Sequence, residues 1–134
     1  LDLTQECIKT DNFIQENGPI DMILLGIGMN GHLGLNEPGT SFDLYSHIVE
    51  LAEITKKVGQ KYFSEKVKLS SGISLGTRQI MEAKTVIVQL NGAEKAEIAR
   101  RLTESEISTA FPASILKLHS NAFLILDKEA SKYL

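Results

Sequence analysis

The feature that most constrains the fold is a short apolar run over residues 21–26, Asp-Met-Ile-Leu-Leu-Gly, in which polar and apolar residues do not alternate. Strands that are covered on both faces of a parallel sheet have this pattern, whereas half-buried strands alternate. Segments 85–90 and 122–126 are apolar in a similar way, and helical patterns lie between the three runs. Strands that alternate with helices predict an α/β fold in which helices flank an open, mostly parallel sheet.

The rest of the chain completes this alternation. A further strand is expected at 47–51, one or two helical turns at 112–119, a short helix at the end of the chain, and longer helices at 3–16, 53–63, 76–82 and 93–103. Buried-type strands with so few helices form a thin sheet, which indicates part of a larger domain. The first residues show neither an initiator Met nor a signal-peptide pattern, so we expect the parent protein to be longer at its N-terminus.

Composition and charge exclude several classes of function. The formal net charge is -3 for 134 residues, so there is no broad basic surface to bind nucleic acid or an anionic membrane. No stretch approaches the roughly 20 apolar residues of a membrane span. The single cysteine, Cys7, excludes an internal disulfide and a cysteine-based metal cluster, and it fits a reducing compartment such as the cytoplasm. Its position in the first helical pattern predicts a partly buried structural thiol.

Residues 26–39 form a loop that carries the clearest chemistry, because it follows the first apolar run directly and five of its 14 residues are glycine. Open α/β sheets bind ligands at the carboxyl ends of their strands, and glycine lets the backbone approach a ligand there. His32, Asn36 and Glu37 lie in this loop. A histidine transfers protons near neutral pH, and a neighbouring carboxylate orients it and favours its protonated form. The cluster fits proton transfer between sugar oxygens, and a turn or capping cluster with an incidental histidine fits the spacing equally well.

A dinucleotide-binding loop is a weaker interpretation of the same glycines. The spacing Gly-x-Gly-x-x-Gly is present over residues 26–31, but His32 and Pro38 stand where the helix of such a motif should run. The spacing alone is a weak signal, so no nucleotide cofactor is expected.

Lys95 and Lys61 are the candidate cations for an anionic substrate. Lys95 falls in the first turn of the helix expected at 93–103, where the helix dipole disfavours a cation unless an anion such as phosphate binds beside it. A solvated surface lysine fits Lys95 equally well, and an exposed helix lysine fits Lys61 better. His119 is expected to cap or pack at the end of a short helix, and His47 to be structural or exposed.

The loop sequence resembles that of a known family. Residues 28–38 read Gly-Met-Asn-Gly-His-Leu-Gly-Leu-Asn-Glu-Pro, which is similar to the signature of the glucosamine-6-phosphate deaminases and isomerases, with its Asp-Gly-His and Asn-Glu-Pro elements. The 6-phosphogluconolactonases share a related Gly-His loop without the Asn-Glu-Pro element. Segments 108–114 and 118–121 resemble the galactosamine-6-phosphate isomerase branch. The resemblance covers essentially the whole chain and corresponds to the later part of those proteins.

The resemblance implies a Rossmann-like sugar-phosphate isomerase fold and a reaction that needs no metal or cofactor. Galactosamine 6-phosphate or glucosamine 6-phosphate is isomerised and deaminated to a ketohexose 6-phosphate and ammonia. His32 would protonate the ring oxygen and help to open the ring, and Glu37 would orient His32. The implied catalytic residues are His32, Glu37 and Asn30, and the implied substrate-binding residues are Lys95, Lys61, Gly31 and Asn36.

Three departures from the family pattern limit this interpretation. Asn30 stands where the glucosamine enzymes have aspartate, and His47 and Val49 stand where they have allosteric cations. The family's Ser/Gly-rich phosphate loop and its proton-abstracting aspartate lie in an earlier segment without a counterpart here. We therefore expect residues 1–134 to be the C-terminal part of a single isomerase/deaminase domain. A preceding segment of the same protein would be its partner, and the reaction would not be completed without it.

Two other functions stay open at this point. A 6-phosphogluconolactonase-like hydrolase would use the same kind of loop, although the Asn-Glu-Pro element argues against it. A sugar-phosphate-sensing effector domain would keep a phosphate contact such as that of Lys95 without needing His32 or Glu37. The sequence also leaves open the C4 epimer of the substrate and whether the protein forms a homo-oligomer.

Overall fold

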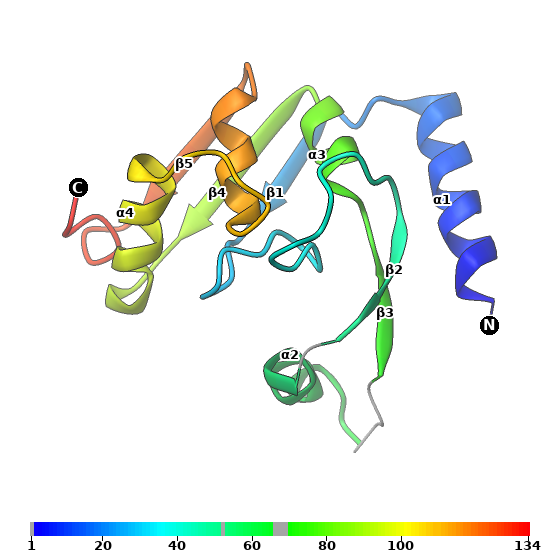
Figure 1. Ribbon diagram of the computed structural model, residues 1–134, viewed down its shortest axis with the longest axis horizontal. Helices are drawn as coiled ribbons and strands as arrows, with labels where there is room; N and C mark the ends of the chain where they lie inside the picture. The colour runs from blue at the N-terminus through cyan, green and yellow to red at the C-terminus, as the bar shows by residue number, and fades with distance from the viewer. Residues whose placement is uncertain (1, 52, 66–69) are drawn as a thin grey trace.

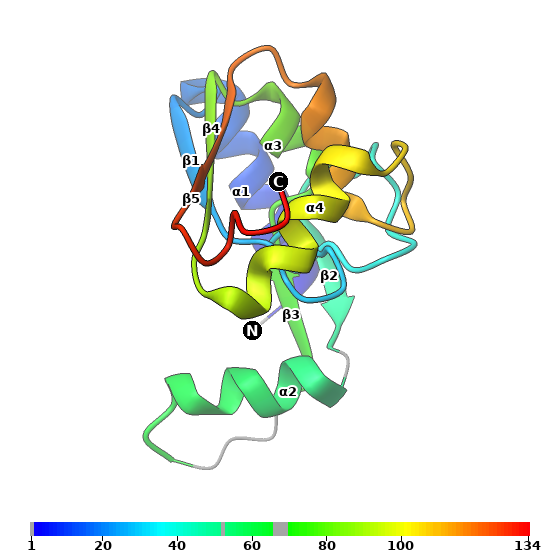
Figure 2. The ribbon, with the colours of Figure 1, turned by 90° about the vertical axis from the view of Figure 1, so that its left-hand side faces the viewer.

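The computed structural model describes residues 2–51, 53–65 and 70–134, and Figures 1 and 2 show how their elements are arranged. The α-helices are α1 (Leu3–Asn17), α2 (Glu53–Gly59), α3 (Thr77–Glu82) and α4 (Ala96–Glu104). The 3₁₀ helices are η1 (Gln60–Tyr62), η2 (Ala93–Lys95) and η3 (Pro112–Leu118). The strands are β1 (Met22–Leu25), β2 (His47–Glu50), β3 (Ser71–Ser74), β4 (Thr85–Leu90) and β5 (Ala122–Leu126). Within the described ranges no helix combines the length and the apolar content needed to cross a membrane.

Three strands form the main sheet in the order β1-β4-β5, and both neighbouring pairs are parallel. The register places Leu24 of β1 opposite Ile87 of β4, and Ile87 opposite Phe123 of β5. This arrangement confirms the predicted α/β fold with an open, parallel sheet. The strand predicted at 47–51 does not join the sheet, because β2 pairs antiparallel with β3 and the two form a separate ribbon.

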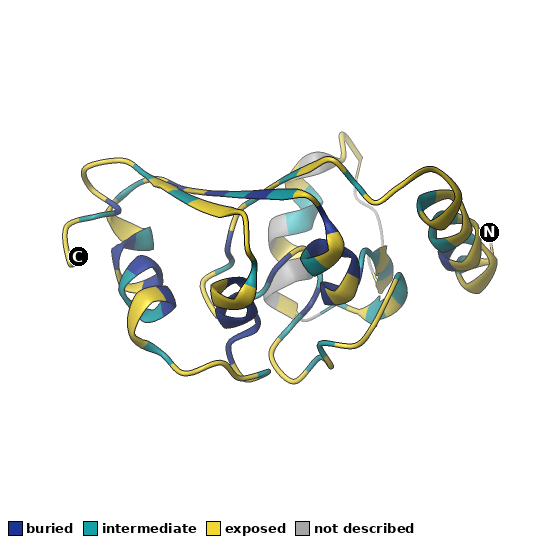
Figure 3. Cartoon of the chain, turned by 90° about the horizontal axis from the view of Figure 1, so that it is seen from above, coloured by how far each residue is buried: buried dark blue, intermediate teal, exposed yellow. Residues whose placement is uncertain are grey.

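The core lies between one face of this sheet and the helices α3, α4 and η3. Val86, Val88 and Leu90 of β4 are at most 2% exposed. They pack with buried residues of the three helices, which are Ile80, Ile98, Ala99, Leu102, Ala113, Ile115 and Leu116. Figure 3 shows the buried residues gathered on the side of the sheet where these helices lie. Removal of this apolar surface from water is the main driving force that holds the layers together.

The opposite face of the sheet is open within the described residues. Met22, Leu24, Phe123 and Ile125 are each at least 52% exposed. The prediction that residues 21–26 are covered on both faces is therefore wrong for this chain, since exposed and half-buried residues alternate along β1. Its apolar composition is nevertheless typical of a parallel sheet that is covered on both sides.

Helix α1 lies beside the β2–β3 ribbon, at one end of the molecule (Figure 1). Its Asp11 carboxylate accepts hydrogen bonds from the Ser46 N–H at 3.1 Å and from the Gln79 amide at 2.7 Å. Cys7 is buried in this helix, in agreement with the expected structural thiol. Burial, together with the neighbouring Asp11 carboxylate, raises the pKa of the Cys7 thiol.

Three predicted helices differ from those observed. The helix expected at 53–63 is divided into α2 and η1, and the helix expected at 93–103 is divided into η2 and α4. The short helix expected at the end of the chain is wrong, because residues 127–134 form successive turns. Asp127 caps these turns by accepting the Ala130 N–H through its side chain at 2.7 Å. A side-chain bond of this kind offers the backbone a local alternative to helical hydrogen bonds.

Candidate active site

A two-residue turn within the loop 26–39 determines where its side chains face. Leu33 and Asn36 pair across the turn, with an N–H···O distance of 2.9 Å from Asn36 to Leu33 and 3.4 Å in the other direction. Gly34 begins the turn with a φ of +58°, which glycine adopts at little cost. Both Leu33 and Asn36 are fully buried. Because side chains alternate along a hairpin, His32 and Glu37, the next pair outward, face the other way.

The side chain of Asn30 joins His32 to Glu37. Its Oδ1 atom accepts hydrogen bonds from the backbone N–H of His32 at 3.2 Å and from the ring Nδ1 at 2.8 Å. Its Nδ2 atom donates to Glu37 Oε2 at 2.8 Å. The ring Nδ1 and Glu37 Oε2 themselves lie 3.8 Å apart. The three side chains therefore form one hydrogen-bonded chain.

These bonds determine which nitrogen of the His32 ring carries the hydrogen. A backbone N–H only donates and an ionised carboxylate only accepts, so the Asn30 amide must turn its oxygen to His32 and its nitrogen to Glu37. An oxygen that faces Nδ1 requires Nδ1 to be the donor. The neutral ring is therefore the Nδ1–H tautomer, and Nε2 keeps the lone pair that can exchange a proton with a ligand.

Two glycines of the loop are required by the close approach of aromatic rings. The His32 ring lies against Gly28, where a Cβ would be 2.0–2.4 Å from three ring atoms. Gly31 has a φ of +91°, and a Cβ there would be 2.1 Å from the Phe111 ring. Any larger residue at either position would displace the ring or the loop.

The segment 108–114 holds the loop from a second side. The Ala113 N–H donates to the Gly31 carbonyl at 2.9 Å, and the Gly39 N–H donates to the Thr109 carbonyl at 2.8 Å. The buried Phe111 ring lies beneath the Arg101 guanidinium, which is 4.3 Å from the ring centroid. Sequence reasoning did not assign Phe111 or Arg101 to the site, because no local pattern reveals that an aromatic residue packs on a distant glycine.

Lys95 reaches the same loop from the carboxyl end of β4. It is the last residue before α4, and its Nζ donates to the Ile27 carbonyl at 2.7 Å. The parallel pairing of β1 and β4 explains this contact, because their carboxyl ends lie at the same edge of the sheet. An ammonium group has three hydrogens, so two remain for an anion.

The structure brings five of the predicted site residues together at this edge: Asn30, Gly31, His32, Glu37 and Lys95. Asn36 belongs to the same loop, but its side chain faces inward and its Nδ2 donates to the carbonyls of Leu33 and Leu75. It thus has no exposed group to offer a ligand. Lys61 is exposed on η1, in the excursion between β2 and β3 that Figure 2 shows standing away from the sheet.

The other two histidines make structural hydrogen bonds. His119 donates from Nε2 to the Ala83 carbonyl at 2.8 Å and accepts the Asn121 N–H at Nδ1 at 3.0 Å. His47 donates from Nδ1 to the Tyr45 carbonyl at 2.9 Å. Over the described residues, no group of three or more His, Cys, Asp or Glu side chains is arranged to hold a metal ion.

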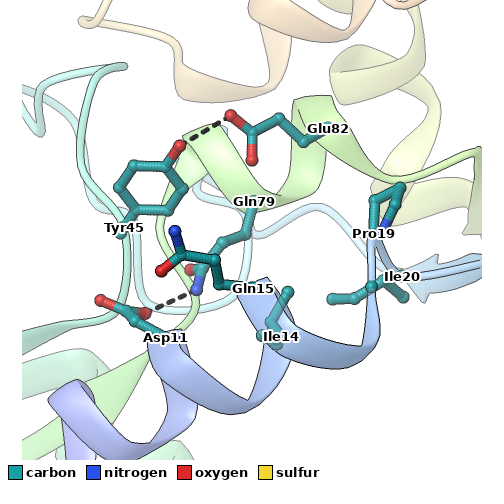
Figure 4. A pocket seen from close by; sticks show the side chains of 9 residues that line it. Asp11, Ile14, Gln15, Pro19, Ile20, Tyr45, Gln79 and Glu82 are labelled. Carbon is teal, nitrogen blue, oxygen red and sulfur yellow. Dashed lines mark hydrogen bonds between the residues drawn. The ribbon is translucent and has the colours of Figure 1, made fainter.

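A separate pocket lies between α1 and α3 (Figure 4). Asp11, Gln79 and Glu82 are among the residues that line it, and the Tyr45 hydroxyl donates to the Glu82 carboxylate at 2.8 Å. This bond, together with burial, raises the pKa of Tyr45. None of the lining residues belongs to the loop 26–39, so this pocket is distinct from the candidate site.

Comparison with known proteins identifies relatives over nearly the whole chain. A family model described as "Glucosamine-6-phosphate isomerases/6-phosphogluconolactonase" matches residues 2–125. The glucosamine-6-phosphate deaminase of Shouchella clausii is 45% identical over 130 residues, which are 96% of this chain and 53% of that protein. The glucosamine-6-phosphate deaminase 1 of Bacillus subtilis is 40% identical over 131 residues, which are 97% of this chain and 54% of that protein. The chain thus spans about half the length of the curated relatives it matches.

Solved structures agree on the fold. A structure described as a monomeric glucosamine-6-phosphate deaminase matches with a TM-score of 0.90 and 39% identity, over 99% of this chain and 56% of that chain. The 6-phosphogluconolactonase from Trypanosoma brucei matches with a TM-score of 0.75 and 22% identity, over 99% of this chain and 54% of that chain. At that lower identity the likeness is one of fold alone.

Proposed function

The chain belongs to the family of glucosamine-6-phosphate isomerases and 6-phosphogluconolactonases, and on this premise we propose that the protein containing it converts a 2-amino-2-deoxyhexose 6-phosphate into a ketohexose 6-phosphate and ammonia. The observation that carries the proposal is the hydrogen-bonded chain of His32, Asn30 and Glu37 at the carboxyl end of β1. The names of the relatives, which are glucosamine-6-phosphate deaminases at 40–45% identity, support the amino-sugar substrate class.

In this proposal His32 opens the sugar ring. The substrate is mostly a closed pyranose, and its C2 hydrogen becomes acidic only when ring opening exposes a carbonyl at C1. The Nε2 atom of His32 takes the proton of the C1 hydroxyl and returns it to the ring oxygen as the bond between C1 and that oxygen breaks. Among the described residues Nε2 has no hydrogen-bond partner, so it is available for this transfer.

Glu37 and Asn30 support His32 in different ways. When Nε2 takes a proton, the imidazole ring of His32 becomes positively charged. The Glu37 carboxylate, 3.8 Å from Nδ1, stabilises that charge. Asn30 is uncharged and acts by geometry, since its oxygen keeps the hydrogen on Nδ1. The later transfer of a proton from C2 to C1 needs a second base, which we propose lies in the parent protein outside these 134 residues.

Lys95 and the start of α4 are the proposed binding site for the 6-phosphate. The ammonium hydrogens that do not bond to Ile27 and the first backbone N–H groups of α4 are donors suited to an anion. We further propose that the sugar lies against the Gly31 backbone and that Lys61 supplies a second cation from the β2–β3 excursion.

We propose galactosamine 6-phosphate as the preferred epimer. The segment 108–114 resembles that branch of the family, and it bonds directly to Gly31 and Gly39 of the site loop. A segment in contact with the catalytic loop is a suitable place for a change in sugar specificity. The relatives are named for glucosamine 6-phosphate, so the assay has to compare the two epimers.

The test is an ammonia-release assay on the protein that contains this chain, with each epimer and with 6-phosphogluconolactone in parallel. Release of one ammonia for each ketohexose 6-phosphate formed is the expected result. Lactone hydrolysis without ammonia release would replace the proposal by the hydrolase alternative. Binding of the sugar phosphates without any turnover would indicate a sensing domain and would remove the catalytic role of His32.

A further inference from the structure

The turn that carries His32 and Glu37 is tied to the end of β3 by Asn36. The Asn36 side chain is 0% exposed, and its Nδ2 donates to the Leu33 carbonyl at 2.8 Å and to the Leu75 carbonyl at 2.9 Å. The first bond closes the turn, and the second joins the turn to the link between β3 and α3. The same side chain therefore shapes the turn and anchors it.

Stability alone does not explain an amide at this position. The Asn36 Oδ1 atom is buried and has no hydrogen-bond partner among the described residues. A buried polar atom without a partner is unfavourable, and an apolar side chain of similar size would avoid that cost. The amide is thus better explained by the two carbonyl groups that its nitrogen holds together than by a contribution to stability.

Ser74 makes a second tie at the same place. Its Oγ accepts the Leu35 N–H at 3.1 Å and donates to the Leu75 carbonyl at 2.9 Å. Ser74 is itself fixed, because it pairs with His47 in the β2–β3 ribbon. Two neighbouring residues of the turn are therefore bound to two neighbouring residues at the end of β3.

We infer that Asn36 and Ser74 are positioning residues that keep His32 and Glu37 opposite each other. The peptide that follows Asn36 leads directly into Glu37, so a turn anchored at Asn36 fixes the starting point of that side chain. Glu37 must stay within reach of the Asn30 amide, which in turn keeps the hydrogen of His32 on Nδ1. Loosening of the turn would break this chain and leave the imidazole free to adopt either tautomer.

The tautomer can be measured without a substrate, by ¹⁵N NMR of the imidazole nitrogens at about pH 8, above the usual pKa of histidine. These 134 residues contain three histidines, and two of them serve as internal references in the protein that contains the chain. His47 donates from Nδ1 and His119 donates from Nε2, so they report the two pure tautomers. We expect His32 to be the Nδ1–H tautomer in the wild type and a mixture in Asn36→Ala, with both references unchanged.

Kinetics test the consequence for catalysis, and this part rests on the proposed function. Asn36→Ala should lower kcat by about tenfold per folded molecule, less than the roughly 10²–10⁴-fold of a whole acid–base group, and leave KM within about threefold. Ser74→Ala should lower kcat in the same direction, and Ser74→Thr should restore it because the hydroxyl group is kept.

Gln79→Ala is the matched control. Gln79 is also a buried amide, 2% exposed, but it bonds to Asp11, Ser46 and Gly76 and makes no hydrogen bond to the loop 26–39. The Gln79→Ala variant should be less stable than the wild type, while the His32 tautomer and kcat stay unchanged. This control separates a positioning role from a general loss of packing.

The outcomes distinguish this inference from the proposed function. A pure Nδ1–H tautomer of His32 in folded Asn36→Ala and Ser74→Ala would overturn the inference, whatever the kinetics. If Asn36→Ala does not fold, the comparison of Ser74→Ala with Ser74→Thr tests the inference by itself. A mixture of His32 tautomers in Asn36→Ala would support the positioning role even if the wild-type protein released no ammonia from either epimer. Only the proposed function would then be wrong.

Discussion

Replacement of Gly31 by alanine tests how tightly the site loop is packed. The new Cβ would lie 2.1 Å and 2.4 Å from two atoms of the Phe111 ring, well inside van der Waals contact. The ring has little room to move, because Phe111 is 3% exposed and lies beneath the Arg101 guanidinium. Alanine would also have to adopt a φ of +91°, which residues with a Cβ rarely do.

Gly31→Ala combines a backbone cost and a packing cost in the free energy of unfolding, and the same substitution at Gly39 separates the two. A left-handed backbone costs a non-glycine residue about 1–2 kcal/mol, and overpacking of a buried site costs about 1–3 kcal/mol. Gly31→Ala should therefore lower the free energy of unfolding by about 2–5 kcal/mol. Gly39 has a φ of +92°, but a Cβ there would meet no atom within 4 Å. Gly39→Ala should thus lose only the backbone part, about 1–2 kcal/mol.

Urea unfolding followed by circular dichroism measures both variants, and the effect of alanine on the unfolded chain is common to them. A double-mutant cycle with Phe111→Leu identifies the contact, because Gly31→Ala should cost less once the ring is smaller. Equal losses in Gly31→Ala and Gly39→Ala would refute the argument. So would a loss in Gly31→Ala that does not depend on the residue at position 111.

Three further predictions concern single side chains. His32→Gln should lower kcat by about 10²–10⁴-fold with the fold intact, and Glu37→Gln should lower it less; normal turnover in both variants would exclude this loop as the ring-opening site. Lys95→Ala should raise KM for the sugar phosphate by about 10–100-fold, from the loss of a charge-assisted bond, and an unchanged KM would contradict its phosphate contact. Because burial and Asp11 raise the pKa of Cys7, less thiolate is present at a given pH. Iodoacetamide should therefore label native Cys7 more slowly than the urea-unfolded chain at the same pH, and equal rates would count against a buried thiol.

Local pattern was sufficient to predict the strands of the main sheet. Residues 21–26, 85–90 and 122–126 are apolar runs, and each contains an observed strand. The pairing of 47–50 with 71–74 was not predicted, because Ser71-Gly72-Ile73-Ser74 has no strong strand pattern and becomes extended by pairing with β2. The exposure of Met22 and Leu24 was also missed, since an apolar run shows that a strand can be buried but not what covers it.

The sequence predicted which residues of the candidate loop lie close together, but only part of their geometry. Motif spacing and family resemblance singled out Asn30, His32 and Glu37, and hydrogen bonds join the three side chains in the structure. Their catalytic roles stay a prediction. The inward direction of Asn36 follows from the turn at Gly34, which puts residues 33 and 36 on one side and residues 32 and 37 on the other. The tie to Ser74 depends on a contact 39 residues away in the sequence, which no local pattern reveals.

The ribbon of β2 and β3 gives the chain a modular architecture. Its strands run side by side, and the Leu51 N–H donates to the Ser70 carbonyl at 3.0 Å just past the paired residues, so the excursion between them leaves and returns at nearly the same point. The turn that carries His32 and Glu37 is bound at the other end of the ribbon, through Ser74. Evolution could therefore lengthen, shorten or exchange the excursion, with its Lys61, while Asn30, His32 and Glu37 keep their arrangement. In such a layout, the proposed recognition of the substrate's outlying groups and the proposed chemistry at its ring can diverge independently.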